Sequence, residues 1–389
     1  MAKQSHIEQM IQNLCPAGVD TMTLGEIEDD GIVTLGRGNV ISKDTIAANP
    51  GDYPVYSSSS QGNGEMGRYG LYMFTDKRIS WSIDGGGKFF FRDDPYYSVT
   101  NVCGWLKVNK EEILDVKYLY YVLYEQWIHK LFDYTLKAHP SVIRELYIIP
   151  MPPIKVQKEI VRILDTFADL IDNIDAEIDA RKAQLETALN RYFEADTKKV
   201  PISELGKITR GKRFVRTDIV EQGTPCIHYG DIYTRYPVCV DTALTYLTGD
   251  ITKKMRYVKS GDVVYVGAGE NDEDIGMAIA WLGKEPAAVH DACYILSEHK
   301  QDAKYLAYMS RANDFHQQLK MSVASGKICS IPPDGLGRVK IPVPPIAEQR
   351  AIAEKLDTIE AFINNLKTER DLRQQQYEYY REHLINLLK

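Results

Sequence analysis

Two stretches of the chain carry the apolar spacing of long amphipathic helices. Apolar residues recur at alternating steps of four and three from residue 160 to 189, and again, less regularly, from residue 352 to 387. A period of about 3.5 residues is typical of a coiled-coil seam, in which one apolar stripe faces a partner helix. Either stripe alone would be marginally stable. We therefore predict two long helices that pair with each other.

Both patterns start in the same way, with "IPMPPIKVQKEI" at Ile149 and "IPVPPIAEQRAI" at Ile341. A shift of 192 residues aligns them without a gap, and 17 of the 44 positions from 149 to 192 are identical. The prolines force an extended lead-in before each helix. Arg181 and Arg373 stand where each seam would continue. Each arginine could be a buried polar residue that fixes the register of the two helices, or it could interrupt the seam. We favour the interruption because an arginine stem can lie on apolar surface while its charged group stays in water.

Weaker similarity extends upstream of each helix. "LGEI" at Leu24 parallels "LGKI" at Leu205, and "DVKYLYYVL" at Asp115 parallels "DAKYLAYMS" at Asp302. The repeating unit is thus a globular domain of about 150 residues followed by a long helix. We predict globular domains at 1–148 and 197–340, with proline-rich lead-ins and coiled-coil helices at 149–196 and 341–389.

A duplicated unit favours an approximate two-fold arrangement. If the helices pair antiparallel, the two domains lie at opposite ends of a rod. About 30 helical residues span about 45 Å, close to the roughly 34–36 Å of one turn of duplex DNA. The match is suggestive only, because coiled coils of this length are common.

The globular segments read as short strands separated by glycine turns. Runs such as "DGIVTLGRGNVI", "KRISWSIDGGGKFFFR" and "GDVVYVGAGE" are rich in β-branched and aromatic residues. Each segment ends in a helical stretch, at about 116–132 and 303–319. The predicted fold class is α+β: two β-rich mixed domains and two long helices that pair as an antiparallel coiled coil, with a pseudo-two-fold internal repeat.

Composition narrows the class of protein. The chain is 44% hydrophobic and 26% charged, no apolar run approaches the roughly 20 residues of a membrane span, and the start lacks a signal-peptide pattern. The six cysteines are scattered, which indicates free thiols in a reducing cytosol. We expect a cytoplasmic protein. The net charge of −7 argues against a simply basic nucleic-acid binder, although residues 197–340 carry 20 basic and 17 acidic side chains and are the only net-basic segment.

No motif for catalysis or metal binding stands out. The glycine-rich pieces lack the spacing of a phosphate loop, and H-E-x-x-H and G-x-S-x-G are absent. The eight histidines do not cluster along the sequence. The paired prolines lack the preceding Asn or Asp of the amino-methyltransferase motif, so we interpret them as helix lead-ins. We predict no catalytic residue, no metal ligand and no cofactor bound by this chain.

Two kinds of loop are candidates for nucleic-acid contact. "KITRGKRFVRTD" is basic and "YSSSSQGNGEMGRYG" offers small hydroxyl and amide side chains, which suit phosphate and base-edge hydrogen bonds. Idle surface turns remain an equal alternative for both. The predicted DNA-binding residues are Arg37, Lys43, Ser57, Ser58, Gln61, Arg68 and Lys88 in the first half, and Arg210, Lys212, Arg213, Arg216, Tyr229, Asp231 and Arg235 in the second.

The signature I-P-x-P-P-I-x-x-Q-x-x-I-x-x-x-L-D, used twice behind two variable domains, resembles the specificity subunit of type I restriction-modification systems. The resemblance covers nearly the whole chain. It implies that each domain reads one half of a bipartite duplex DNA target, that the helices set the spacer, and that two modification subunits dock on this chain and methylate adenine with S-adenosylmethionine. Restriction subunits that hydrolyse ATP with Mg²⁺ then join. The expected docking residues are Pro152, Pro153, Gln157, Pro344, Pro345 and Gln349.

Two rival functions remain. One is a scaffold whose β-rich domains bind peptides or glycans, and the other is an enzyme with a site in a glycine-rich loop. The acidic net charge fits the DNA-reading function only if the acid lies away from the DNA faces. The bases read and the spacer length do not follow from the sequence.

Overall fold

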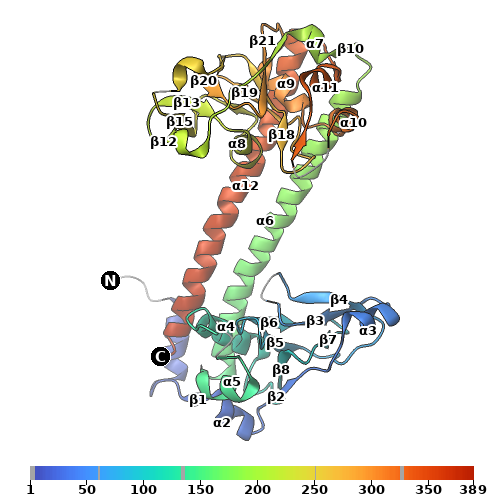
Figure 1. The fold of residues 1–389 in the computed structure, drawn as a ribbon. Helices are drawn as coiled ribbons and strands as arrows, with labels where there is room; N and C mark the ends of the chain where they lie inside the picture. Colours follow the sequence, from blue (N-terminus) through green and yellow to red (C-terminus); the bar gives the residue numbers. More distant parts are fainter. Residues whose placement is uncertain (1–4, 60–61, 133–135, 250, 325–327) are drawn as a thin grey trace. The chain divides into compact units, whose positions relative to one another are not determined.

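The computed structural model describes residues 5–59, 62–132, 136–249, 251–324 and 328–389 (Figure 1). The chain divides into two compact units. Unit 1 comprises Met1–Asn173 and Glu369–Lys389, and unit 2 comprises Ile174–Thr368. Each unit therefore contains one β-rich domain together with the first part of one long helix and the last part of the other.

The two long helices are α6 (Ile154–Glu194) and α12 (Ile346–Asn386), with 41 residues each. Each spans about 60 Å at 1.5 Å per residue. The sequence predicted about 30 helical residues, so both helices are longer than predicted. The helix continues through the arginine that interrupts each seam, because that arginine bonds neighbours on its own helix. Arg181 donates to Glu177 and Gln184, both at 2.8 Å.

The pairing of the helices is antiparallel within each unit. In unit 1, Ile160 and Leu164 near the start of α6 share a core with Leu384 and Leu388 at the end of the chain. In unit 2, Leu189 near the end of α6 shares a core with residues at the start of α12. The side chain of Arg181 is 39% exposed, and its guanidinium lies 5.1 Å from the centre of the Phe362 ring of α12. Among the described residues, no helix combines the length and the apolarity that crossing a membrane requires.

The β-rich domain of unit 1 contains two main sheets, with strand orders β2-β8-β5-β6 and β4-β3-β7, and β1 pairs with β9. Strands β3 and β7 are parallel, which brings their ends to the same edge. The elements are α1 (His6–Leu14), β1 (Thr21–Thr23), α2 (Leu24–Asp29), β2 (Val33–Arg37), α3 (Lys43–Ala48), β3 (Tyr53–Tyr56), β4 (Glu65–Tyr69), β5 (Arg78–Ser82), β6 (Phe89–Arg92), β7 (Ser98–Val99), β8 (Cys103–Val108), α4 (Val116–Trp127), α5 (Pro140–Leu146) and β9 (Ile148–Pro150).

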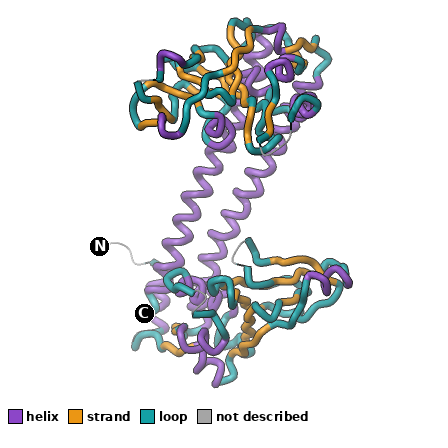
Figure 2. Tube along the Cα trace, viewed as in Figure 1, coloured by secondary structure: helices purple, strands orange, loops and turns teal. Residues whose placement is uncertain are grey.

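Unit 2 has the matching sheets, β11-β21-β17-β19-β14 and β12-β15-β13-β20-β16, with β13 parallel to β20. Figure 2 shows the strands of each unit in orange beside the purple helices. The elements are β10 (Lys199–Pro201), α7 (Ile202–Leu205), β11 (Lys207–Arg210), η1 (Arg216–Asp218), β12 (Ile219–Val220), β13 (Thr224–Ile227), α8 (Tyr229–Thr234), β14 (Cys239–Val240), β15 (Thr245–Leu247), η2 (Thr252–Lys254), β16 (Tyr257–Val258), β17 (Val263–Val266), β18 (Ala268–Gly269), β19 (Ala278–Trp281), β20 (Ala287–Val289), β21 (Cys293–Ser297), α9 (Ala303–Met309), α10 (Asn313–Lys320), β22 (Cys329–Ser330), α11 (Pro333–Gly337) and β23 (Lys340–Pro342).

A junction of partly buried hydrogen bonds joins each domain to its long helix. In unit 1, Asp165 accepts from the Tyr121 hydroxyl at 2.5 Å and from the Lys117 amine at 2.9 Å. In unit 2, Asp357 accepts from Tyr308 and Lys304, both at 2.7 Å. The repeated L-D-T sequence is therefore the anchor point of each domain on its helix.

The helical stretch before each junction differs from the prediction. The first is α4 alone, which ends at Trp127, and the second is broken into α9 and α10. Gln126 and Gln318 both bond the backbone of the strand before the long helix. Gln318 follows Asp302 by five residues more than Gln126 follows Asp115. The extra residues of unit 2 fall at the break, where the backbone of Ala312 is extended.

Candidate nucleic-acid interface

Three strand ends meet at one edge of unit 1. Residues 55–56 of β3 pair with residues 98–99 of β7 in parallel, so Ser57 and Thr100 leave the sheet side by side. Asn39, just beyond β2, forms a bridge with Thr100. The edge of parallel strands at which their carboxyl ends meet is a common place for a binding site, because the connecting loops converge there.

Hydroxyl groups fill this edge of unit 1. Thr100 donates to the Ser57 Oγ at 3.0 Å, and the Oγ atoms of Ser58 and Ser82 are 2.8 Å apart. The backbone N–H of Asp84 donates to Ser58 at 2.9 Å. The structure thus brings together Ser57 and Ser58 from the predicted set and fixes both in a network of side-chain bonds.

The same edge is built in unit 2 by matching backbone hydrogen bonds. Gly211 N–H donates to the Cys293 carbonyl at 2.9 Å, as Gly38 does to Cys103 at 3.1 Å. The next residue repeats the match in both units. The N–H of Asn39 donates to the carbonyl of Val99 at the end of β7, and the N–H of Lys212 donates to the carbonyl of Val289 at the end of β20. The register of β13 and β20 then places His228 and His290 where unit 1 has Ser57 and Thr100.

An arginine occupies the equivalent position in both units and folds back onto the main chain. Arg37 donates through Nε and Nη2 to the Asn101 carbonyl at 3.0 and 2.7 Å. Arg210 donates through Nε to the Asp291 carbonyl at 2.6 Å. Both side chains remain exposed. These two predicted contact residues also hold the turn that follows β7 or β20.

Four rings pack together at the edge of unit 2. The centre of the His290 ring lies 4.8 Å from that of Phe214 and 4.9 Å from that of His228, and Tyr229 lies 4.4 Å from His228. Burial lowers the pKa of both histidines. Only Tyr229 of this group was predicted. The stretch "TPCIHYGD" at Thr224 is similar to "DYPVYSSSS" at Asp52, and aligning their prolines places His228 opposite Ser57, which is the sequence signal that could have found it.

Exposed cations lie beside the rings. Lys212, Arg213 and Arg216 are exposed, and none of the three forms an ion pair within the described part of the chain. Arg213 is close enough to His290 to disfavour its protonated form. These three residues follow one another along the loop after β11, so the predicted basic loop does lie at the strand-end edge.

The remaining predicted contact residues differ from one another in the contacts that they make. Arg68 pairs with Glu65 at 3.0 Å and with the Asp52 carbonyl, and Lys88 lies 5.1 Å from the centre of the Phe90 ring. Lys43 is the exposed first residue of α3. Asp231 and Arg235 pair with each other along α8 at 3.2 Å. Gln61 lies outside the described residues.

The predicted docking residues divide by exposure. Gln157 and Gln349 are 0% and 1% exposed, and Pro152 and Pro344 are also buried. Gln157 bonds Asp115 N at 2.8 Å and the Pro152 carbonyl at 2.8 Å, and Gln349 repeats both contacts with Asp302 and Pro344. These four residues are buried in the junction of this chain, and their docking role stays a prediction. Pro153 and Pro345 are exposed, and their docking role stays a prediction.

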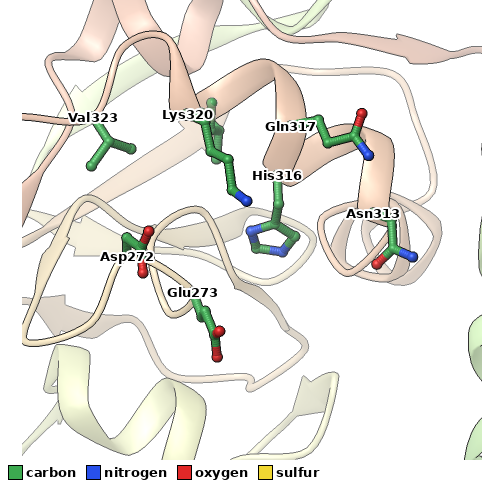
Figure 3. A pocket seen from close by; sticks show the side chains of 8 residues that line it. Asp272, Glu273, Asn313, His316, Gln317, Lys320 and Val323 are labelled. Atoms are coloured by element: carbon green, nitrogen blue, oxygen red, sulfur yellow. The ribbon is translucent and has the colours of Figure 1, made fainter.

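A separate cavity of about 380 Å³ lies in unit 2. Figure 3 shows the His316 ring and the Lys320 amine between α10 and the loop of Asp272 and Glu273. Burial lowers the pKa of His316. None of the predicted binding residues lines this cavity, and within the described residues no group of His, Cys, Asp and Glu has the arrangement of a metal site.

The sequence of this chain is similar to a known protein family and to several of its members. The model of the type I restriction modification DNA specificity domain matches residues 16–181 and again residues 194–373. A protein of Mycoplasma pneumoniae named as a type I specificity subunit is 25% identical over 371 residues, which covers 92% of this chain and 96% of the relative. The MjaVIII specificity subunit of Methanocaldococcus jannaschii is 26% identical over 80% of this chain and 78% of its own.

Among solved structures, the S subunit of a type I restriction-modification system from M. genitalium has the same fold. The TM-score is 0.56 at 15% identity, over 94% of this chain and 96% of that one. Together with a family model that matches both halves, the repeated junctions and the paired helices lead to one conclusion: the chain belongs to the family of type I restriction-modification DNA specificity subunits.

Proposed function

We propose that this chain reads a bipartite duplex DNA target for a type I restriction-modification complex. Unit 1 contacts one half-site and unit 2 contacts the other, each through the edge where its parallel strands end. The observation that carries the proposal is that one backbone arrangement is built twice while the side chains on it differ. A protein that reads two different short sequences needs this combination, because backbone contacts position it and base contacts specify the sequence.

The chemistry at the two edges fits DNA. Lys212, Arg213 and Arg216 are exposed cations that can neutralise phosphates. Serine hydroxyls in unit 1 and imidazole groups in unit 2 can bond base edges in the major groove. The acidic net charge of the whole chain does not oppose this function, since association responds to the local field at the contacting surface.

The long helices have two proposed roles. They set the number of unread base pairs between the half-sites, and they dock two modification subunits, with Pro153 and Pro345 in the contact. The modification subunits bind S-adenosylmethionine and methylate adenine. Restriction subunits supply the ATP- and Mg²⁺-dependent steps. This chain supplies recognition without catalysis.

The test is a map of methylated adenines in cells that express this chain with its modification subunit. We expect a two-part motif with a fixed gap. The purified complex should also bind duplex DNA with an affinity that falls steeply with salt, because phosphate contacts release counterions. Absence of both methylation and salt-sensitive binding, with a modification subunit that is active on another specificity subunit, would contradict the proposal and favour a scaffold for peptides or glycans.

A further inference from the structure

The strand-end edges of the two units hold different pairs at matching positions. In unit 1 the pair is Ser57 and Thr100, joined by a hydrogen bond of 3.0 Å. In unit 2 it is His228 and His290, whose ring centres are 4.9 Å apart. The same parallel register places both pairs, so His228 occupies the position that corresponds to Ser57, a predicted DNA contact of unit 1.

His290 is fixed on both ring nitrogens. Its Nδ1 accepts from the backbone N–H of Ala292 at 3.1 Å, so the proton of the neutral ring is on Nε2. That Nε2–H donates to the Phe214 carbonyl at 3.1 Å. The side chain is 14% exposed and stands edge-on to the Phe214 ring. His290 therefore presents a fixed ring face to its neighbour and has no free polar atom.

His228 is fixed on one nitrogen and open on the other. Its Nδ1 accepts from the Gly230 N–H at 3.2 Å, which places the proton of the neutral ring on Nε2. No hydrogen bond from the described residues reaches this Nε2, and it is not among their buried unpaired atoms. The ring packs against both His290 and Tyr229, whose own ring centres are 5.5 Å apart. The result is a neutral N–H donor of fixed direction that solvent can reach.

Burial, rather than the surrounding charges, keeps the two rings neutral near pH 7. Burial is the largest cause that lowers the pKa of each ring, and the charges of His228 and Arg213 lower the pKa of His290 further. Asp231 and Asp291 act in the opposite direction without reversing the shift. A neutral donor has no special attraction for phosphate, and the exposed cations of the same edge serve that role better.

We propose that His228 is a specificity-determining residue of unit 2, which donates its Nε2–H to an acceptor on a base edge, and that His290 is the positioning residue that holds its ring. The proposal rests on the proposed function and assigns a residue to it. The acceptors available in the major groove are N7 of a purine, O6 of guanine and O4 of thymine.

The experiment selects bound duplexes from a random-sequence library, using the full chain assembled with its modification subunits. Wild type is compared with His228→Phe, which keeps a ring and removes the donor, and with His228→Gln, which keeps an N–H donor. His316→Phe is the matched control, because His316 is a half-buried histidine of the same unit outside the ring cluster. For His228→Phe we expect discrimination at one position of one half-site to fall about five- to tenfold, as for the loss of one base contact. The other half-site and the control should not change.

His228→Gln should retain part of the preference at that position, and His290→Phe should lose it there and nowhere else. An unchanged motif with His228→Phe would overturn the proposal, as would an equal loss at all positions, which indicates phosphate binding. No enrichment by wild type would instead remove the proposed function itself. If His228→Phe does not fold, the ¹⁵N resonance of the His228 Nε2 in the wild-type complex decides: it should shift when a selected duplex is added and not when an unselected one is.

Discussion

The junction and the strand-end edge can each be compared between the two units. At the junction, Gln157 bonds Asp115 in unit 1 as Gln349 bonds Asp302 in unit 2, and the tyrosines and lysines on the preceding helix bond the same aspartate of the L-D-T sequence. At the edge, serine and threonine stand where the other unit has two histidines. The difference teaches where change is tolerated. Buried polar groups cost free energy unless every partner stays in place, whereas groups at the edge can bond water or a ligand.

The two junctions also differ at one buried position. Arg381 in α12 pairs with Glu125 in α4 at 2.7 Å, and both side chains are 6% exposed. The position of α6 that matches Arg381 is Leu189, which packs in the apolar core of unit 2. Unit 1 therefore depends on an ion pair where unit 2 uses an apolar contact.

The largest expected effect comes from breaking that ion pair. Arg381→Leu should lower the free energy of unfolding of unit 1 by about 3–5 kcal/mol, because it leaves the Glu125 carboxylate buried without its partner. The double variant Arg381→Leu with Glu125→Leu should recover most of the loss, since an apolar pair can replace a buried ion pair. Urea unfolding of the full chain, followed by probes in each unit, measures both. A double variant no more stable than the single one would show that packing, not charge, is responsible.

Removal of the junction glutamines should have the next largest effect, and it should be similar in the two units. Gln157→Ala and Gln349→Ala each leave a buried N–H and a buried carbonyl without a partner, which costs about 2–3 kcal/mol. Gln184→Ala, on the exposed face of α6, is the control and should change stability by less than about 0.5 kcal/mol. A loss of stability in only one unit would show that the corresponding hydrogen bonds contribute unequally to the stability of the two units.

Acid should separate the units by a smaller amount. Burial lowers the pKa of four histidines in unit 2, His228, His290, His299 and His316, below the ordinary value of 6.5. The unfolded chain then binds more protons than the folded unit, so stability is present above pH 6.5 and is lost as the pH falls below it. The melting temperature should fall by about 2–4 °C for each kcal/mol lost. Hydrogen exchange at pH 7.5 and 5.5 should show earlier opening of β17 and β20, and His316→Gln should reduce the difference between the two pH values.

The smallest effect concerns the cations of the edge. Arg213→Ala should weaken binding to all duplexes alike and reduce the slope of log affinity against log salt by about one, because one phosphate contact is lost. Lys284→Ala removes the same charge from another loop of unit 2 and should leave the slope unchanged. A sequence-dependent loss with Arg213→Ala would place this residue among the base contacts instead.

The long helices were predictable because their signals are local and periodic. The spacing of Ile160, Leu164 and the residues after them gave the seam, and the repeated proline-rich start located both helices. The predicted length was too short because the apolar pattern runs only from 160 to 189, whereas α6 extends beyond it at both ends, from Ile154 to Glu194.

The site was predictable only in part because its residues meet through sheet pairing. Ser57, Ser58, Arg210 and Lys212 lie in loops with a visible composition. His228 and His290 are 62 residues apart and look isolated along the sequence, and only the parallel pairing of β13 with β20 brings them together. The burial of Gln157 and Gln349 was not predictable, because a glutamine after a helix start gives no sign of whether it is buried.

The division of the two long helices has a consequence for synthesis. The segments of unit 2 are contiguous, from Ile174 to Thr368, whereas unit 1 is closed by Glu369–Lys389. Domains made first on the ribosome usually fold first. Here the core of unit 1 includes Leu384 and Leu388, so it stays incomplete until the last of these residues has emerged. We expect the second unit along the chain to reach its native state first, with the first unit exposing apolar surface, and needing protection from aggregation, until synthesis reaches those residues.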